Sequence, residues 1–470
     1  MAVAAVLGLC ACSKKPQTSG KGGSAQLARG IDPLKDENPF PSTYKPLPSV
    51  PTAITGVTIL TATGEKIDNG TVLMRGGKIE AVRRGIVRPA GYRIVALKGG
   101  WVTPGVIDPH SHLGVYPSPG IDSLADGNEM TDPDTAQVWA EHSIWPQDPG
   151  FNAARAGGVT TLEILPGSSN LFGGRSVILK NVPSETVQGM KFPGAPQGLK
   201  MACGENPRRI YGAKGRAPST RMGSMAGYRE AWIKAAEYRQ AWDAYDAKVR
   251  AGEKADPPKR DLQLDTLADA LRGRIGVQMH CYRADEMAYM IDLAKEFGYR
   301  IVAFHHASEA YKIPGLLKAN GICAVVWGAG WWGYKMEAFD GIEANAAMLQ
   351  KAGVCVSLHS DDATVVQHLP RDAAIAIAAG RRMGIDIGEA DAVKWFTINP
   401  ARIIGVAERT GSLENGKDAD VVLWDRDPFS VYAVAEKVYV DGALVYDAHD
   451  PKYQAKSDFD VGLPAEEGMP

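Results

Sequence analysis

The central part of the chain alternates short apolar runs with longer segments whose apolar residues recur every three or four positions. The short runs predict buried strands, and the longer pattern predicts covering helices such as Asp285–Phe297 and Ile342–Ala352. Eight strands are expected here: Trp101–Ile107, Gly158–Leu165, Arg175–Leu179, Gly198–Ala202, Ile275–His280, Arg300–His305, Ile322–Trp327 and Val354–His359. Eight β/α units favour a parallel barrel over an open doubly wound sheet. We therefore expect an α/β fold in which residues 101–404 form a (β/α)8 TIM barrel.

One stretch is longer than the loops of a minimal barrel. Residues 205–274 separate the fourth and fifth strands, which predicts an insertion. Its segment Tyr228–Arg250 has a strong helical pattern, with Trp232 and Trp242 on related faces. Such an aromatic stripe is more typical of core packing than of a nucleotide-stacking surface, so we expect a helical insertion that packs on the barrel.

Both flanks of the barrel show a different pattern. Ala53–Val87 contains short alternating runs broken by Asn69-Gly70 and Gly76-Gly77, which is typical of hairpins. Gly411–Asp447 has the same texture near the other end of the chain. We expect residues 53–100 and 405–470 to form one small composite β-sandwich.

Composition and charge exclude several classes. Of 470 residues, 45% are hydrophobic and 23% charged, which excludes a wholly disordered or coiled-coil chain. The net charge is -2, so no overall positive field attracts nucleic acid. We expect a small molecule or short peptide as the partner, and either a monomer or a homo-oligomer is compatible with the sequence.

The N-terminus is apolar and ends in two cysteines. Residues 1–12 read MAVAAVLGLCAC and resemble the lipobox of bacterial lipoproteins, which implies lipidation at Cys12. Residues 13–52 are rich in small and polar residues and then in proline, as in a flexible tether. We therefore expect export to the cell envelope or periplasm, with membrane contact through a lipid anchor. The other cysteines, Cys203, Cys281, Cys323 and Cys355, are scattered singly through apolar segments and are expected as buried free thiols.

Candidate metal ligands lie at the ends of predicted strands. His110 and His112 close the first strand, and side chains at i and i+2 share one face of an extended chain. His280, the pair His305-His306, and Asp361 follow later strands, and Lys200 is a charged residue inside an apolar run. Neutral imidazoles suit zinc and neighbouring transition metals, and catalytic groups collect at this end of barrel strands. The set predicts a metal site at the mouth of the barrel.

From about Val57 to Asp447 the chain resembles the amidohydrolase superfamily, in particular its imidazolonepropionase- and prolidase-like branch. The motifs that carry the resemblance are Pro104–His112 (PGVIDPHSH), Gly157–Thr161 (GGVTT), His359–Ala363 (HSDDA), Thr397–Val406 (TINPARIIGV) and Gly411–Trp424 (GSLENGKDADVVLW). The resemblance implies a distorted (β/α)8 barrel with a composite β-sandwich. It also implies the metal ligands His110, His112, Lys200, His280, His306 and Asp361.

The resemblance further implies a binuclear centre, with two zinc ions bridged by a carboxylated Lys200. Lys180 is the rival bridging lysine, and His305 is the rival of His306. The implied reaction is hydrolysis of an amide or peptide C–N bond, in a dipeptide or an N-acyl amino acid. In it a hydroxide that bridges the metals attacks, and Asp361 acts as general base.

The alternative function is that of a mononuclear imidazolonepropionase-like lactam hydrolase or deaminase. The sequence departs from the family pattern after Gly204, where Glu205–Arg209 (ENPRR) and the insertion replace a short loop. The expected substrate-binding residues are Arg221, Tyr228 and Trp331.

Overall fold

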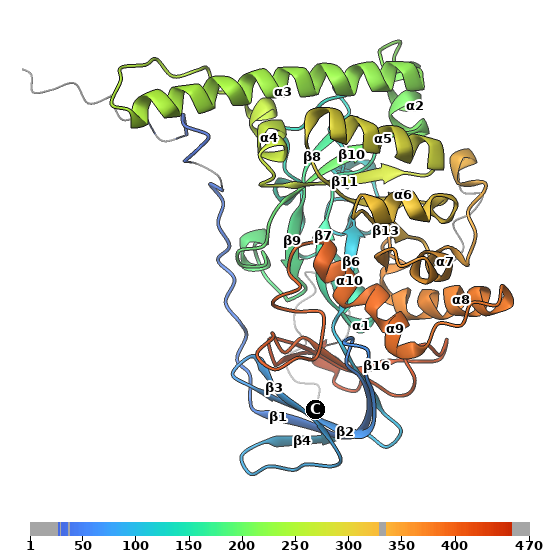
Figure 1. Cartoon of the computed structure of the whole chain (residues 1–470). Coiled ribbons are helices and arrows are strands. Elements are labelled where there is room, and N and C mark those ends of the chain that lie inside the picture. The colour runs from blue at the N-terminus through green and yellow to red at the C-terminus, as the bar shows by residue number, and fades with distance from the viewer. Residues whose placement is uncertain (1–26, 29, 36–37, 329–334, 454–470) are drawn as a thin grey trace, which may run out of the picture.

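The computed structural model describes residues 27–28, 30–35, 38–328 and 335–453. Figure 1 shows a sheet built from both ends of the chain at the bottom, the central strands with their helices above it, and a long helix across the top. None of the helices in these ranges is long and apolar enough to cross a membrane. The expected lipidation site, Cys12, lies outside the described residues.

The lower sheet contains strands from both flanks. Its strand order is β17-β16-β15-β5-β1-β2-β3, with β4 paired to β1. The strands are β1 (Thr52–Leu60), β2 (Lys66–Arg75), β3 (Lys78–Arg84), β4 (Arg93–Ala96), β5 (Trp101–Pro104), β15 (Val421–Trp424), β16 (Ala435–Val440) and β17 (Ala443–Asp447). The antiparallel pair Val102 and Leu423 joins the two ends of the chain, and both side chains are buried in one apolar cluster. The hydrogen bonds thus unite both flanks in one continuous sheet.

The central strands form two further sheets, ordered β14-β13-β12-β11-β10-β8 and β6-β7-β9. Their bounds are β6 (Val106–Ser111), β7 (Val159–Ile164), β8 (Phe172–Arg175), β9 (Val177–Lys180), β10 (Gly198–Ala202), β11 (Gly276–Cys281), β12 (Ile301–His306), β13 (Cys323–Val326) and β14 (Val356–Leu358). The pairs from β10 to β14, and the pair β6–β7, are parallel.

The third expected strand is not a parallel one. It consists of β8 and β9, which run antiparallel to β10 and β7 respectively. The connection between Ile164 and Phe172 is too short for the crossover helix that a parallel pair requires, because such a crossover takes about a dozen residues or more. The chain therefore turns back directly, and the expectation of eight parallel strands was wrong at this position.

No hydrogen-bonded ladder closes the described strands into a barrel between β6 and β14. Pro109 in β6 has no backbone N–H to contribute to such a ladder. The residues after β14 bond to β6 instead: the Asp361 backbone N–H donates to the His110 carbonyl at 3.1 Å, and the Ser360 hydroxyl donates to Asp108. The two strands are thus tied at the position where the candidate metal ligands gather.

Helices cover the outside of the central strands (Figure 1). They are α1 (Pro149–Ala156), α2 (Glu205–Ala213), α3 (Arg221–Arg250), α4 (Leu262–Leu271), α5 (Ala284–Phe297), α6 (Pro314–Ala319), α7 (Asn345–Lys351), α8 (Leu369–Arg382), α9 (Glu389–Ala392) and α10 (Ile398–Ile403). The insertion supplies α2, α3 and α4. Trp232 on α3 is fully buried, edge-on to Phe172 and stacked on Tyr299, so its aromatic stripe packs into the core.

The four cysteines of the central region form two disulfides, so the expectation of free thiols was wrong. Cys203 pairs with Cys281, and Cys323 pairs with Cys355. Strand register explains both pairs, since Ala202 is opposite His280 on β10 and β11, and Ala324 is opposite Val356 on β13 and β14. Cys203 and Cys281 directly follow the first of these pairs, and Cys323 and Cys355 directly precede the second. Because the partners are 78 and 32 residues apart along the chain, the sequence alone does not show that they are close in space.

Candidate metal centre

The candidate ligands from five strands converge at the carboxyl ends of the central sheets. The Nε2 atoms of His110 and His112 lie 3.3 Å apart, and each is within 3.4 Å of the Asp361 carboxylate. His306 lies 3.9 Å from the other oxygen of Asp361. His280 packs against His306 with ring centroids 4.4 Å apart. The i, i+2 spacing of His110 and His112 therefore turns both rings to one point, as β6 geometry requires.

Four of these side chains could hold one metal ion together. One ligand atom each from His110, His306, His359 and Asp361 lie within 4.8 Å of one another. His359 was not predicted as a ligand, although it stands two residues before Asp361 at the end of β14. Its place at the end of the predicted strand Val354–His359 is the signal that could have found it.

The chemistry of this donor set fits a divalent metal. Nδ1 of His280, Nδ1 of His306 and both ring nitrogens of His359 are buried without a hydrogen-bond partner among the described residues. Burial, with nearby Lys200, holds the pKa of His110 and of His280 well below the usual value. Burial also lowers the pKa of His359 to about 4. Neutral imidazoles with orphaned nitrogens are the form that binds a metal.

The structure separates the two adjacent histidines on β12. His305 points into the interior, where its Nδ1 lies 2.9 Å from Nδ1 of His110 and its Nε2 lies 2.8 Å from Oε1 of Gln278. His306 faces the cluster. His305 therefore orients His110 from behind, as outer partners of metal-binding histidines do.

The two candidate lysines are also placed apart. Lys200 Nζ lies 3.1 Å from Nε2 of His110 and donates to the Pro166 carbonyl at 3.0 Å. Lys180 lies instead among Asp418, Asp420 and Asp441, at 3.0, 3.6 and 2.6 Å. Burial lowers the pKa of Lys200 to about 7, against smaller opposing effects of Asp361 and Glu163. Only Lys200 belongs to the candidate metal centre.

Asp361 is held as an anion. Burial favours its neutral form, but the hydrogen bond and charge of His112 and the nearby Lys200 keep its pKa below the usual value. Its backbone adopts a left-handed φ of 59°, which turns the carboxylate back over β6. Glu163, behind Lys200, behaves oppositely: burial raises its pKa to about 8.

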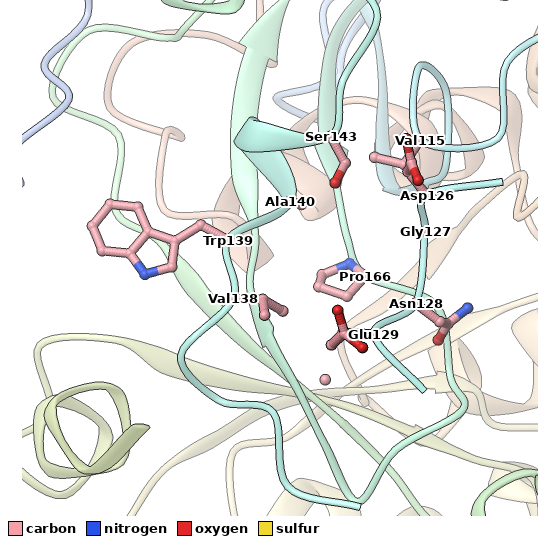
Figure 2. Close-up of a pocket in the computed structure, with 11 residues that line it drawn as sticks. Val115, Asp126, Gly127, Asn128, Glu129, Val138, Trp139, Ala140, Ser143 and Pro166 are labelled. Atoms are coloured by element: carbon pink, nitrogen blue, oxygen red, sulfur yellow. The ribbon is translucent and has the colours of Figure 1, made fainter. Parts of the chain in front are cut away.

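A cavity of about 400 Å³ opens onto the cluster. Its walls include His112, Asn206, His280, Lys335 and Asp361. A smaller neighbouring cavity of about 160 Å³ shares Asn128 with it. Figure 2 shows Asn128, Glu129 and Pro166 around this smaller cavity, with Trp139 turned away from them.

The expected substrate-binding residues do not line the cavity of the metal cluster. Arg221 pairs with Glu337 and with Glu286 beside a different cavity. Tyr228 is 1% exposed and its hydroxyl donates to the Ala202 carbonyl in the core. Trp331 lies outside the described residues. Among the side chains that line this cavity, Asn206, Arg209 and Lys335 were not predicted from the sequence to bind substrate.

Known proteins of similar sequence and fold belong to the family that the sequence motifs resemble. The model of the amidohydrolase family matches residues 101–454. A crystallised amidohydrolase from Thermotoga maritima MSB8 is 36% identical, with a TM-score of 0.76, covering 84% of this chain and 100% of that one. A prolidase crystallised with N-methylphosphonate-L-proline is 17% identical with a TM-score of 0.51, covering 84% of this chain and 99% of that one, and shows the shared fold.

One curated relative is much longer than this chain. Amidohydrolase tasK from Hapsidospora irregularis is 32% identical over 412 residues, which are 82% of this chain and 41% of that protein. The chain thus spans about two fifths of the length of this relative.

Proposed function

The chain belongs to the amidohydrolase family, as its motifs indicate, and we propose that it hydrolyses the C–N bond of a dipeptide or an N-acyl amino acid. The observation that carries this proposal is the cluster of His110, His306, His359 and Asp361, of which His306 and Asp361 line a cavity of about 400 Å³. A cavity of this size suits a small substrate better than a protein. The (β/α)8-type arrangement, with a β-sandwich built from both chain ends, is the framework that we propose around it.

Two divalent ions, zinc in our proposal, would be held by His110, His112, His280, His306, Asp361 and a carboxylated Lys200, with His359 as a further donor. A pKa of about 7 leaves a substantial fraction of Lys200 as free amine at neutral pH, the form that adds CO2 to give an anionic carbamate. When bound, such ions polarise a carbonyl and lower the pKa of water.

Asp361 supplies the proton transfers. Its carboxylate is ionised and faces the cavity, so it can accept a proton from the attacking water. After attack on the carbonyl carbon, the same carboxyl returns the proton to the leaving nitrogen as the C–N bond breaks. Asp108 supports this geometry, because it accepts hydrogen bonds from the Ser360 hydroxyl and backbone N–H next to Asp361.

The test begins with elemental analysis of the full chain, purified with bicarbonate and without chelator, followed by a library of dipeptides and N-acyl amino acids. We expect about two metals per chain and turnover of part of the library. Asp361→Asn should lower kcat by about 10³-fold or more, a loss typical of an essential proton-transfer group. Asp362→Asn is the matched control, because the Asp362 carboxylate is engaged by Thr364, and it should retain most activity.

Other results would lead elsewhere. One metal per chain, with release of ammonia or opening of a lactam, would favour the mononuclear lactam hydrolase or deaminase. A chain that binds no metal after reloading would contradict the proposed function.

We also propose that the protein is exported and anchored through a lipid on Cys12. The two disulfides support an oxidising compartment, since structural disulfides are rare in reducing ones. Fractionation of cells that express the full chain should place it with membranes, and Cys12→Ser should release it. Recovery of the wild type from the reducing cytosol would contradict the proposal.

A further inference from the structure

The wall of the metal cavity carries two cationic side chains from different elements. Arg209 stands on α2, and Lys335 precedes the short helical turn Met336–Ala338. Asn206 and Arg209 are three residues apart on α2 and therefore share a face of that helix. Both belong to the ENPRR segment that departs from the family pattern.

Lys335 is held in a fixed place. Its Nζ donates to Oδ1 of Asn206 at 2.7 Å, and Nδ2 of the same amide lies 3.5 Å from Nε2 of His280. One amide thus links the lysine to a histidine of the metal centre. The ammonium group also lies 6.0 Å from the centre of the Tyr282 ring, on the same cavity wall.

Three carboxylates, those of Glu205, Asp361 and Glu337, attract Lys335, and the two cations of this wall repel each other. In the described parts of the chain, no carboxylate forms an ion pair with the Arg209 guanidinium. Glu205 attracts Lys335 but lines the adjoining cavity, where Glu337 accepts from its backbone N–H. Asp361 faces the histidines, and Asp362 accepts from Thr364. Burial lowers the pKa of Lys335, and repulsion by Arg209 contributes to the lowering.

Two cations that repel each other at the edge of a cavity are stabilised when an anion binds between them. The anion must be part of a molecule whose scissile bond reaches the metal cluster in the same cavity. We propose that Lys335 and Arg209 bind a carboxylate of the substrate, and so restrict the enzyme to dipeptides and N-acyl amino acids with a free carboxyl group. This inference rests on the proposed function and names its substrate class.

The inference assigns to these two residues the role that the sequence suggested for Arg221. Arg221 cannot fill it in this structure, because Glu286 and Glu337 already neutralise it beside another cavity. Lys335 and Arg209 differ in that they share the cavity with the metal ligands.

The experiment compares N-acetyl derivatives of leucine, phenylalanine and proline, and the matching dipeptides, with the same compounds as C-terminal amides. The wild type should prefer the free acids by about 10- to 100-fold in kcat/KM, the range expected for hydrogen bonds to charged groups. Lys335→Met and Arg209→Met should lose most of that preference, chiefly through a higher KM for the free acids. Lys335→Arg should restore part of it, and Lys234→Met, on the exposed face of α3, should change nothing.

A bound metal also attracts carboxylates, so a second measurement removes it. Calorimetric titration of the metal-free protein with each N-acetyl amino acid and its amide should show tighter binding of the acid, and Lys335→Met should abolish the difference. Equal affinity for acid and amide in wild type, or equal loss of both in the variants, would overturn the inference. If the wild type hydrolyses none of the compounds, the proposed function fails, and the titration alone decides whether the carboxylate site exists.

Discussion

Lys180 and Lys200 are both fully buried in the central strands, yet their surroundings are opposite. Lys180 pairs with Thr161 near the start of β7 and contacts three aspartates from the terminal sheet region. Lys200 on β10 contacts a histidine ring and a carbonyl, with no carboxylate within ion-pair distance among the described residues.

The pKa shifts follow from these surroundings. Burial disfavours the charged form of both lysines, but the aspartates overcome it and raise the pKa of Lys180. Without such neighbours, the pKa of Lys200 falls to about 7. Lys180 is therefore a cation that joins two parts of the fold, whereas Lys200 is partly a neutral amine near pH 7. Lys180 thus lies near the amino end of β7, whereas Lys200 lies with the candidate metal ligands at the carboxyl ends, where (β/α) architectures place their active sites.

The disulfides are divided in the same way. Cys203–Cys281 joins the carboxyl ends of β10 and β11, next to His280. Cys323–Cys355 joins the amino ends of β13 and β14.

The largest effect is expected from Lys200→Met. It should lower kcat/KM by about 10³-fold or more, equal to about 4 kcal/mol of transition-state stabilisation. The metal content should fall in parallel, while the free energy of unfolding of the metal-free protein does not decrease, because a buried amine is replaced by an apolar chain. Steady-state kinetics, elemental analysis and urea unfolding measure the three quantities. A variant with full activity and two metals would break the distinction between the lysines.

Lys180→Met should act on stability alone. It leaves Asp420 and Asp441 buried without their cation, whereas Asp418 keeps Lys78 and Arg409. Removing one partner of a buried ion pair costs about 3–5 kcal/mol. Urea unfolding should show this loss, with kcat per folded molecule unchanged. Adding Asp441→Asn should recover part of it, since that change removes one charge and asparagine tolerates the left-handed φ of 46°. Loss of metal from folded Lys180→Met protein would contradict this separation.

Replacing each disulfide by alanines should lower the free energy of unfolding by about 2–4 kcal/mol. Only the Cys203→Ala, Cys281→Ala pair should also weaken metal binding, because Cys281 directly follows His280. Competition with a chromogenic chelator measures this difference, and the Cys323→Ala, Cys355→Ala pair is the matched control. Equal metal affinity in both variants would show that the ligands do not depend on the nearby bond.

The smallest effect, taken per pH unit, is the change of stability with pH. Lys200 has a pKa of about 7 in the folded chain and about 10.4 unfolded, so the unfolded chain binds one more proton between these values. Its contribution therefore makes the metal-free protein more stable as pH rises through this window, by at most about 1.4 kcal/mol per pH unit. Lys180 acts the other way, since its raised pKa contributes stability that is lost only above the unfolded value. Urea unfolding from pH 7 to 10 should show this slope in wild type and a smaller one in Lys200→Met; identical slopes would refute it.

The sequence alone predicted the mixed α/β fold, the family and most of the side chains that gather at the candidate metal centre. Alternating strand and helix patterns and the strand-end motifs identified the α/β architecture and the family. His110 and His112 were predictable because an i, i+2 spacing on a strand determines a shared face locally. His359 ends a predicted strand and could have been considered on that ground, whereas the left-handed φ of Asp361 lies outside the rule for an extended chain.

Other features of the site depend on residues that are distant in the sequence, and only the tertiary structure decided them. Lys180 and Lys200 both stand on short apolar strands, and only the aspartates around position 420 distinguish them. Likewise, strand register brings Cys203 to Cys281, and the packing of the insertion turns Arg221 to Glu337 while it brings Arg209 and Lys335 into the cavity. Local pattern determines which way a side chain points from its own strand or helix, whereas its charge, its bonds and its chemistry depend on the chain that packs against it.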